Sequence, residues 1–358
     1  MNKFLIRARE WVWLEGDPEK DRSTGLVVAG AVEIALGFLS FSLAMLLLIG
    51  VASAGLGGMN PSHLWMCMGF LFYLTGWFIV VGLGSVKARR WARALVLIGA
   101  WMTIFFGTLF LALTLHVLPE VLDLLTENGV SPMLALGELY FVIGALIALQ
   151  VVFPMIAVGF YNLRGVKATC ERRNPNPCWS DRVPLPLLAM GFICAMGCFS
   201  LVWCAPTNHV VFVFGRILSG GEGMVVIALI SVAFGYVGWG AFTRKIHAWW
   251  GAYALVLITS TSMMLTFAEM ELADLFTHMG YAPELVEKWE RIEAVSPAAL
   301  TLATCVWGVM VCVYLVWARD CFHPEKDHAE VKSYAGRKAE EDAALPEKPK
   351  GPRMRLDD

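Results

Sequence analysis

Residues 26–48 read LVVAGAVEIALGFLSFSLAMLLL, an apolar run that contains one ionisable residue, Glu33. A helix of this length crosses the hydrocarbon core of a bilayer, which is about 30 Å thick. Inside lipid a backbone has to satisfy its own hydrogen bonds, and a helix does so within a single segment. The run therefore predicts a membrane-spanning helix. It is also expected to act as its own insertion signal, because no cleavable signal peptide is visible before it.

Seven further apolar runs follow this one, with polar gaps between them. They are Leu64–Val86, Ala94–Leu118, Met133–Phe160, Leu185–Ala205, Gly223–Phe242, Trp250–Ala268 and Ala298–Ala318. The whole chain is 58% hydrophobic and only 16% charged, whereas soluble proteins average about 25% charged residues. Together these features predict an all-α, polytopic membrane protein with eight transmembrane helices.

The distribution of positive charge predicts the orientation of these helices. Of the 28 Lys and Arg residues, all but Arg216, Lys288 and Arg291 lie before the first run, after the last run, or in every second gap. Positively charged residues are retained on the cytoplasmic side of a membrane. We therefore expect both termini to be cytoplasmic, in a multi-pass protein of the cell inner (plasma) membrane.

Two of the opposite gaps contain the same pattern, E-x-x-D-L-x-T-x-x-G-x-x-P, at residues 120–132 and 271–283. We interpret the pattern as the trace of a duplicated four-helix unit; the alternative is chance similarity. Each unit has an even number of spans, so both insert the same way and their pseudo-symmetry axis follows the membrane normal. Each copy of the pattern is expected to form an interfacial turn on the outer surface.

The chain then divides into five regions. Residues 1–25 form a cytoplasmic amphipathic segment, 26–163 the first four-helix repeat, 164–184 a cytoplasmic linker loop, 185–320 the second repeat, and 321–358 a cytoplasmic tail. The tail is polar, mixed in charge and interrupted by prolines, which predicts that it is largely disordered.

Two acidic residues inside spans are candidates for function, because an ionisable group in the membrane is costly. Glu33 lies in the first span, and Glu138 lies near the outer end of the fourth. Glu33 either serves transport or is a buried, protonated residue bonded to a neighbouring helix. Glu138 is close enough to the outer boundary to reach the headgroup region.

The seventh span carries a polar stripe on one helical face. Its members are Thr259, Ser262, Thr266 and Glu269. The stripe could line a polar pathway that leads to the outer surface. Alternatively, its hydroxyls bond to the backbone of their own helix or hold neighbouring helices together.

A further candidate is the acidic face at the outer ends of the third and seventh spans. It comprises His116, Glu120, Asp123 and Glu127 from one half and Glu271, Asp274 and His278 from the other. Carboxylate and imidazole groups suit divalent cations. A solvated acidic face explains the same pattern and is the interpretation we favour, so we assign no metal ligand.

The sequence offers no recognisable catalytic pattern. It lacks G-x-S-x-G, H-E-x-x-H and Walker A patterns, and its nine cysteines include no C-x-x-C pair. Its seven histidines fall at or beyond span ends, which does not favour a haem inside the bundle. We assign no catalytic residue and leave the cofactor unspecified. The short basic loops favour contact with anionic lipid over nucleic acid.

The linker loop 164–184 is a candidate docking point for a protein partner. Prolines stiffen the loop and Trp179 supplies an aromatic anchor, although a simple rigid linker has the same features. Together with residues 87–93 (KARRWAR), the loop resembles segments of uncharacterised multi-pass membrane proteins from bacteria. The resemblance implies a bacterial inner membrane and carries no assigned activity.

Two functional classes follow from these observations. The first is a non-catalytic component or accessory subunit of a membrane complex, which fits the scarcity of buried charge. The second is a small-solute or ion transporter with a polar path near spans 1 and 7, which fits the duplication and the polar stripe. The sequence favours the first by a narrow margin and supports an enzyme least. The lipid bilayer is a partner in every case.

Overall fold

The computed structural model describes residues 21–54, 61–127, 131–281, 283, 286–287 and 296–322. Within these residues, seven helices are long and apolar enough to cross a membrane. A further pair of helices, bent by 49° between Cys198 and Ser200, passes the same test if it is one span. The prediction of a helical, multi-pass membrane protein is confirmed, and the count of eight depends on the bent pair. The expected N-terminal segment and C-terminal tail lie almost wholly outside the described residues.

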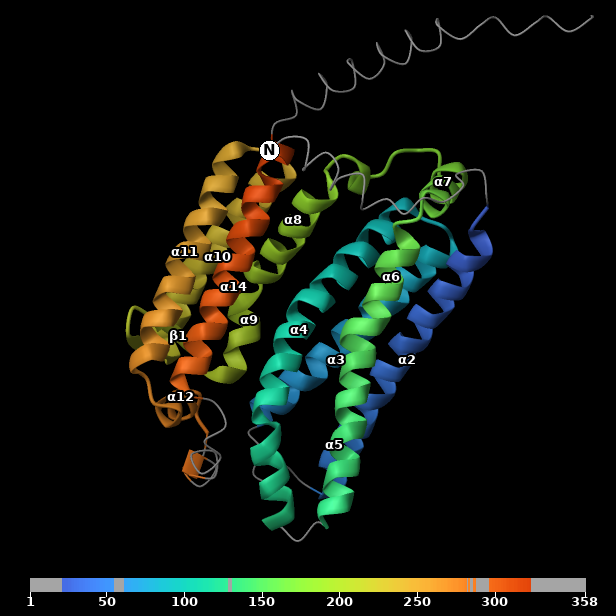
Figure 1. The fold of residues 1–358 in the computed structure, drawn as a ribbon. Helices are drawn as coiled ribbons and strands as arrows, with labels where there is room; N and C mark the ends of the chain where they lie inside the picture. Colours follow the sequence, from blue (N-terminus) through green and yellow to red (C-terminus); the bar gives the residue numbers. More distant parts are fainter. Residues whose placement is uncertain are drawn as a thin grey trace, which may run out of the picture.

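The first bundle consists of the helices that precede the linker loop. Its elements are α2 (Ser23–Ala54), α3 (Pro61–Val86), α4 (Arg90–Glu127), α5 (Pro132–Ile147), the π-helical turn η1 (Ala148–Val152) and α6 (Phe153–Tyr161). The last three form one continuous rod (Figure 1). Pro154 explains the wide turn, because it has no N–H to donate to the carbonyl of Gln150.

The linker contains α7 (Arg164–Arg173) and the short 3₁₀ helix η2 (Trp179–Asp181). The helices of the second bundle are α8 (Leu185–Cys198), α9 (Ser200–Cys204), η3 (Ala205–Thr207), α10 (Gly220–Phe242), α11 (Ile246–Glu269), α12 (Leu272–His278), α14 (Pro297–Ala318) and η4 (Arg319–Phe322). Figure 1 shows the two bundles side by side, with α7 at one end of the first bundle. This is the end that the charge distribution predicts to be cytoplasmic.

A short antiparallel hairpin interrupts the helices of the second bundle. β1 (Val211–Val213) pairs with β2 (Arg216–Leu218), with Phe212 opposite Ile217. Gly215 in the turn has a φ of 85°, a conformation that favours glycine. The sequence did not predict these strands, because an alternating pattern needs more than the three residues that each strand has.

The turn between α3 and α4 has the same geometry as the turn between α10 and α11. In each, one residue is left-handed: Ala88 has a φ of 50° and Arg244 a φ of 54°. The next amide donates to a glycine carbonyl in the preceding helix, Gly84 or Gly240, at 2.8 Å in both turns. Glycine is needed there because a Cβ would collide with an alanine of the facing helix.

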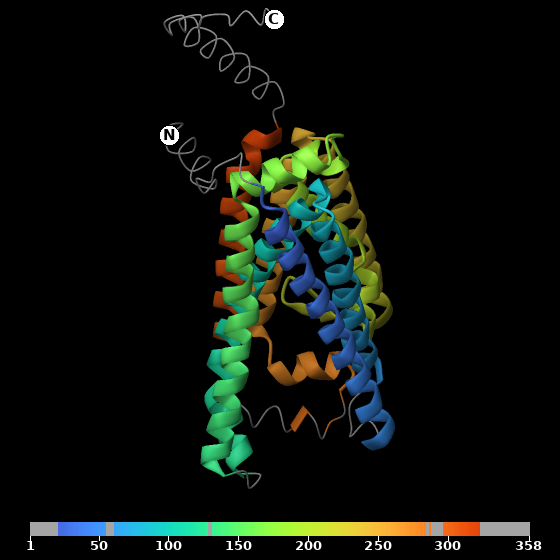
Figure 2. The same ribbon diagram turned by 90° about the vertical axis from the view of Figure 1, so that its right-hand side faces the viewer.

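The two copies of the outer pattern adopt different structures. Residues 120–127 continue α4 without a break, so the expectation of an interfacial turn there is wrong. In the second copy the backbone is extended at Met270 and Glu271, which ends α11 and starts the separate helix α12. Figure 2 shows α12 in orange, lying across the direction of the spans. Pro132 begins α5 as expected, with Ser131 as its cap.

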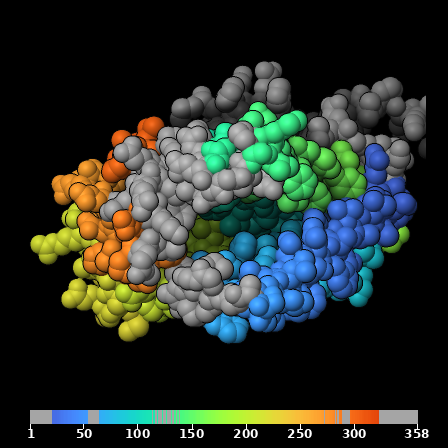
Figure 3. Space-filling view, turned by 90° about the horizontal axis from the view of Figure 1, so that it is seen from below, coloured from blue at the N-terminus to red at the C-terminus, as the bar shows by residue number. Residues whose placement is uncertain are grey.

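The two bundles contact each other along α3 and α4 on one side and α8 and α9 on the other. Ala94, Ile98 and Leu188 form a buried apolar cluster between them. The ring centroids of Trp77 and Phe192 lie 5.1 Å apart. Figure 3, seen from the end opposite α7, shows a hollow with the blue α2 on one side and the second bundle on the other. The bundles thus meet along a seam and are hollowed at the predicted outer end.

Candidate functional site

Three polar side chains from three helices meet inside the first bundle. Glu33 comes from α2, Ser85 from the end of α3 and Tyr161 from the end of α6, and they are 5%, 1% and 1% exposed. The Tyr161 hydroxyl lies 3.0 Å from Glu33 Oε1 and 2.8 Å from Ser85 Oγ. We call these three residues the Glu33 cluster. They form a hydrogen-bonded chain of oxygens in a buried setting.

Two glycines bring α2 and α3 together beside the cluster. A Cβ on Gly30 would lie 2.6 Å from the carbonyl oxygen of Gly82, and a Cβ on Gly82 would lie 2.8 Å from that of Gly30. Small residues are what allow two membrane helices to approach this closely. Glu33 is one turn from Gly30 and Ser85 is one turn from Gly82. The glycine crossing therefore sets the distance between the helices that carry these two side chains.

Tyr161 is held by its backbone as well as by its ring. The Nε of Arg93, in the first turn of α4, donates to the carbonyl oxygen of Tyr161 at 2.9 Å. The ring belongs to the buried core of the first bundle, together with Leu26, Val81 and Leu97. The phenol is therefore positioned by contacts that do not involve Glu33.

α7 covers the cluster at the predicted cytoplasmic end. Its buried residues Val166 and Cys170 belong to the same core as Tyr161. The Thr169 hydroxyl accepts a hydrogen bond from the backbone N–H of Arg22, just before α2, at 3.0 Å. Burial raises the pKa of the Cys170 thiol to about 11, so this thiol is neutral at physiological pH. α7 is therefore linked to the start of α2, and the side chains on its buried face are uncharged.

The chemistry of the cluster centres on Glu33. Its second oxygen, Oε2, is buried and has no hydrogen-bond partner among the described residues. A buried carboxylate oxygen without a partner costs free energy unless a proton or a positive ion compensates it. The arrangement is therefore suited to hold one proton or positive ion on the carboxyl.

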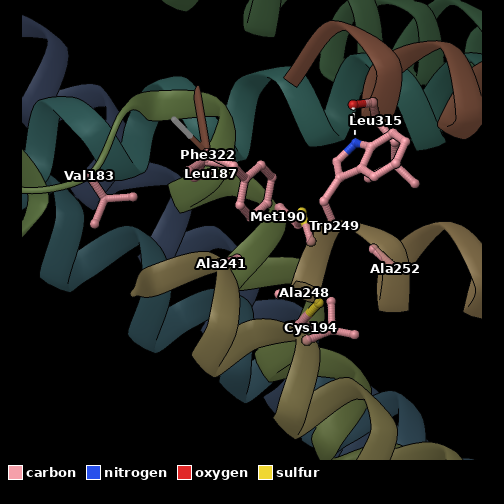
Figure 4. Packing of buried hydrophobic residues seen from close by; sticks show 11 residues of the cluster. Val183, Leu187, Met190, Cys194, Ala241, Ala248, Trp249, Ala252, Leu315 and Phe322 are labelled. Atoms are coloured by element: carbon pink, nitrogen blue, oxygen red, sulfur yellow. Dashed lines mark hydrogen bonds between the residues drawn. The ribbon is translucent and has the colours of Figure 1, made fainter. Parts of the chain in front are cut away.

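In each bundle, a side chain at the start of the third helix holds the end of the fourth. Arg93 does so in the first bundle through the carbonyl of Tyr161. In the second bundle the ring nitrogen of Trp249 donates to the carbonyl oxygen of Leu315 at 2.7 Å, as Figure 4 shows. We call this meeting of the third and fourth helices the helix junction. In both bundles it is held by a side-chain N–H that donates to a backbone carbonyl.

The junction in the second bundle is apolar where the first is polar. The carbonyls of Ser85 and Ala241 each accept a bond from the left-handed residue of their turn, which makes the two positions equivalent. Ala241 is buried with Leu187, Cys194 and Leu315 (Figure 4). Glu33 is the one carboxylate among the buried side chains of the described residues, so none is buried at this second junction. The same helix junction can therefore be packed without a buried acid.

The polar stripe of the seventh span lies in the second bundle, where it holds the β hairpin. The hydroxyl of Ser262 accepts from the N–H of Phe214 at 2.8 Å, and that of Thr266 accepts from the N–H of Gly215 at 3.1 Å. Ser262 also donates to the carbonyl oxygen of Phe212 at 2.9 Å. The hydroxyls of Ser262 and Thr266 thus contact the hairpin backbone.

The other two members of the stripe have different surroundings. Thr259 donates to the carbonyl oxygen of Leu255 in its own helix at 2.7 Å. Glu269 is exposed at the end of α11, and a Cβ on Gly215 would lie 3.3 Å from its Oε2. The structure places this stripe and Glu33 in separate bundles, so it does not bring them into one site.

The outer acidic residues are only partly described. The side chains of His116, Glu120, Asp123, Glu127 and Glu138 lie outside the described part of the structure. Glu271 and Asp274 are exposed, while Nδ1 of His278 lies 3.0 Å from the Ser219 hydroxyl. Among the residues that are described, no three His, Cys, Asp or Glu side chains are grouped so as to hold a metal ion.

The linker loop is fixed to the first bundle by Arg90. Its Nε donates to the carbonyl oxygen of Asn174 at 2.7 Å, and its Nη1 lies 3.3 Å from Oδ2 of Asp181. The same carboxylate accepts from the N–H of Cys178 at 2.9 Å. Burial acts to raise the pKa of Asp181, but the bonds from Cys178 and Arg90 outweigh it and lower the pKa. Trp179 remains 43% exposed on this fixed loop.

Sequence reasoning identified Glu33 but missed its partners. Ser85 and Tyr161 lie at the ends of predicted spans, where a polar side chain is ordinary and gives no signal. Gln150 was also missed, although an amide four residues before a proline inside an apolar run was an available signal. Its Oε1 is buried without a hydrogen-bond partner among the described residues, on the π-helical turn, and a Cβ on Gly107 would lie 2.8 Å from it.

Comparison with known proteins does not identify a relative. No family model, no curated protein and no solved structure matches the chain. The geometry of the Glu33 cluster is therefore the basis for assigning a function.

Proposed function

We propose that this protein is an ion-coupled transporter of a small solute in the cell inner (plasma) membrane, with both termini cytoplasmic. The observation that carries the proposal is Glu33, which is 5% exposed, bonded to Tyr161 through one oxygen and unpartnered among the described residues at the other. Ionisable residues inside membrane bundles commonly mark ion or substrate pathways. Glu33 is the ion-binding residue in this proposal, and Ser85 and Tyr161 position it.

The transporter consists of two four-helix repeats, 26–163 and 185–320, related by an axis along the membrane normal. Three features support the duplication: the repeated outer pattern, the matching turns at Ala88 and Arg244, and the matching contacts of Arg93 and Trp249. Transporters with parallel repeats bind substrate between the repeats. The hollow between the bundles in Figure 3 is the place where a solute would enter.

The two repeats have different tasks in this proposal. The first carries the ion at its helix junction, where the buried polar chain of the Glu33 cluster lies. The second packs the equivalent junction with apolar side chains around Ala241 and is braced by the hairpin on α11. Ion binding at the Glu33 cluster would move helices of the first repeat while the second repeat stays fixed. One side of the solute site would then change.

Ion and solute flux in proteoliposomes that contain the full chain tests the proposal. Amino acids, sugars, polyamines and inorganic ions are offered in turn, while an ion-sensitive dye inside the vesicles reports coupled ion movement. Glu33→Gln should abolish the coupled movement. Glu222→Gln is the matched control, because Glu222 is exposed at the start of α10, and it should behave as the parent does. Equal flux in the parent and in Glu33→Gln would reject the proposal.

A second candidate is a non-catalytic component or accessory subunit of a membrane complex. The linker loop favours it, because Arg90 fixes the loop while Trp179 stays exposed. A rigid surface with an aromatic anchor suits a protein partner. Native purification and identification of co-purifying proteins separates the two candidates. A stoichiometric partner that is lost on Trp179→Ala would favour the subunit, and purification without any partner would count against it.

A further inference from the structure

We propose that the ion held at the Glu33 cluster is a proton, carried on the Glu33 carboxyl and linked through Tyr161 to Ser85. The inference rests on the proposed function, because it names the coupling ion of the same site. It depends on the number of hydrogens and oxygens in the cluster and on the apolar residues that enclose it.

The Tyr161 hydroxyl has one hydrogen but two oxygen neighbours at hydrogen-bond distance, Glu33 Oε1 at 3.0 Å and Ser85 Oγ at 2.8 Å. It can therefore donate to only one of them and must accept from the other. When Glu33 is ionised, Ser85 donates to Tyr161 and Tyr161 donates to the carboxylate. When Glu33 is protonated, it can donate to Tyr161, which then donates to Ser85. Gain of a proton reverses the chain by rotation of hydroxyl groups alone.

A metal cation is a poorer occupant of the same place. Hard cations take six or more oxygen ligands in a shell around the ion. The Glu33 cluster offers three side-chain groups, and their oxygens already lie at hydrogen-bond distance from each other. Leu26, Val81 and Val96 are among the buried apolar residues packed around Tyr161. A proton needs only one oxygen, and Oε1 of Glu33, which lies 3.0 Å from the Tyr161 hydroxyl, can receive it and donate it to Tyr161.

The other titratable groups around the cluster do not replace Glu33 as the proton carrier. On α4, the Nε of Arg93 donates to the carbonyl oxygen of Tyr161. On α7, Cys170 is a neutral thiol, because burial raises its pKa to about 11. α3 contributes the hydroxyl of Ser85, and α8 contributes the partly buried apolar Leu185. Glu33 is thus the group of the cluster that gains and loses the proton.

The reversal provides a way to couple the proton to motion. A hydrogen bond to an ionised carboxylate is about twice as strong as a neutral one. The Tyr161–Glu33 contact joins α6 to α2, so protonation of Glu33 weakens the link between these two helices. Pro154 and the π-helical turn in the same span supply a point at which the rod can bend. Proton binding therefore favours movement of the fourth span away from the first.

Infrared difference spectroscopy of the full chain in lipid nanodiscs, over a pH titration, tests the inference without knowledge of the solute. A protonated carboxylic acid has a carbonyl stretching band that is lost on ionisation. Glu33 should give such a band, and Glu33→Gln should remove it. Glu222→Gln, which alters an exposed carboxyl, should keep the band and its titration unchanged.

A second variant tests the role of Tyr161. Tyr161→Phe should keep the band but move the half-point of its titration to higher pH, because the ionised carboxylate loses its donor. The expected change is about one pH unit, which is a tenfold rise in proton affinity. Ser85→Ala should also move the half-point to higher pH, because the Ser85 hydroxyl bonds to Glu33 directly as well as to Tyr161.

Two results would overturn the inference. The first is a band that is equal in the parent and in Glu33→Gln. The second is displacement of the band by sodium chloride but not by choline chloride at equal ionic strength, which would assign the site to a metal cation. If Glu33→Gln does not fold, the comparison of sodium with choline and the Tyr161→Phe variant still test whether Glu33 carries the proton. If Glu33 titrates but the protein moves no solute, the proton site stands and the proposal of a transporter is rejected.

Discussion

Glu33 and Leu187 show how differently one kind of helix junction can be filled in the same chain. Glu33 is 5% exposed and bonded to Tyr161, whereas Leu187 is fully buried among apolar residues near Ala241. Burying an ionisable side chain is costly unless it is paired. The first junction therefore gives up stability that the second retains, and this cost is expected where a residue serves function.

Replacing Glu33 by Leu and replacing Leu187 by Glu should affect the free energy of unfolding differently. Glu33→Leu should leave the free energy of unfolding unchanged or raise it, because Tyr161 can still bond to Ser85. Leu187→Glu should lower it by about 3 kcal/mol or more, since the new carboxyl is buried without a partner. Thermal unfolding in detergent measures both. A large loss of stability in Glu33→Leu would show that Glu33 is structural and would count against its role as ion carrier.

At the scale of single elements, the hairpin and α11 depend on each other. Two extended strands of three residues cannot bury their backbone groups alone, and the hydroxyls of Ser262 and Thr266 bind the turn that joins them. A polar backbone segment is tolerated next to a membrane helix only when such partners exist. The polar stripe of the seventh span is thus accounted for, at these two positions, by support of the hairpin.

Removing one of these hydroxyls should destabilise the hairpin. Thr266→Val leaves the N–H of Gly215 without its partner and should lower the free energy of unfolding by about 1–3 kcal/mol. Thr259→Val is the matched control, because Thr259 in the described structure bonds to carbonyls of its own helix, and its effect should be small. Hydrogen exchange of residues 211–218 gives a local readout. Equal exchange in the two variants would contradict the assigned contact.

The linker loop should respond to acid through Asp181. Because the pKa of Asp181 in the folded protein is below its ordinary value of 3.8, the stability that it contributes is complete above that value. That contribution is lost as the pH falls through the lowered pKa. At about pH 6, Asp181→Asn should therefore speed hydrogen exchange of residues 174–182 relative to the parent.

At a pH below the lowered pKa of Asp181, the difference between Asp181→Asn and the parent should become small, because the parent carboxyl is then protonated as well. Comparison of the two proteins at each pH removes the intrinsic pH dependence of exchange. A difference that is the same at both pH values would show that the charge of Asp181 does not hold the loop. Arg90→Ala should loosen the same residues at both pH values, since it also removes the bond to Asn174.

At the scale of the whole molecule, the proposed orientation places α7 and the turns at Ala88 and Arg244 in the cytoplasm. A reporter that is active only outside the cytoplasm should be inactive when fused after Phe322 and active when fused after Tyr281. A reporter that is active only in the cytoplasm should give the reverse result. Activity of the first reporter after Phe322 would invert the orientation, and the hollow in Figure 3 would then open to the cytoplasm.

The sequence predicted the positions of the seven long apolar helices closely, but not the bend in the predicted fifth span or where each helix ends outside the membrane. The two copies of the outer pattern share six residue identities, yet one copy extends α4 and the other forms α12. Local residues alone do not explain this difference. The second copy packs beside the hairpin, where Asn208 donates to the carbonyl oxygen of His278 and Ser219 lies against its ring. These contacts come from distant parts of the chain.

By itself the sequence determined the helical, multi-pass architecture and singled out Glu33, because hydropathy and charge are properties of short windows of residues. Only the tertiary structure decided that Glu33 meets Tyr161, which is 128 positions away, and that Ser262 and Thr266 hold a hairpin. The reason is physical. The partner of a side chain depends on the rotation and crossing of its helix, which distant contacts such as Gly30 on Gly82 set.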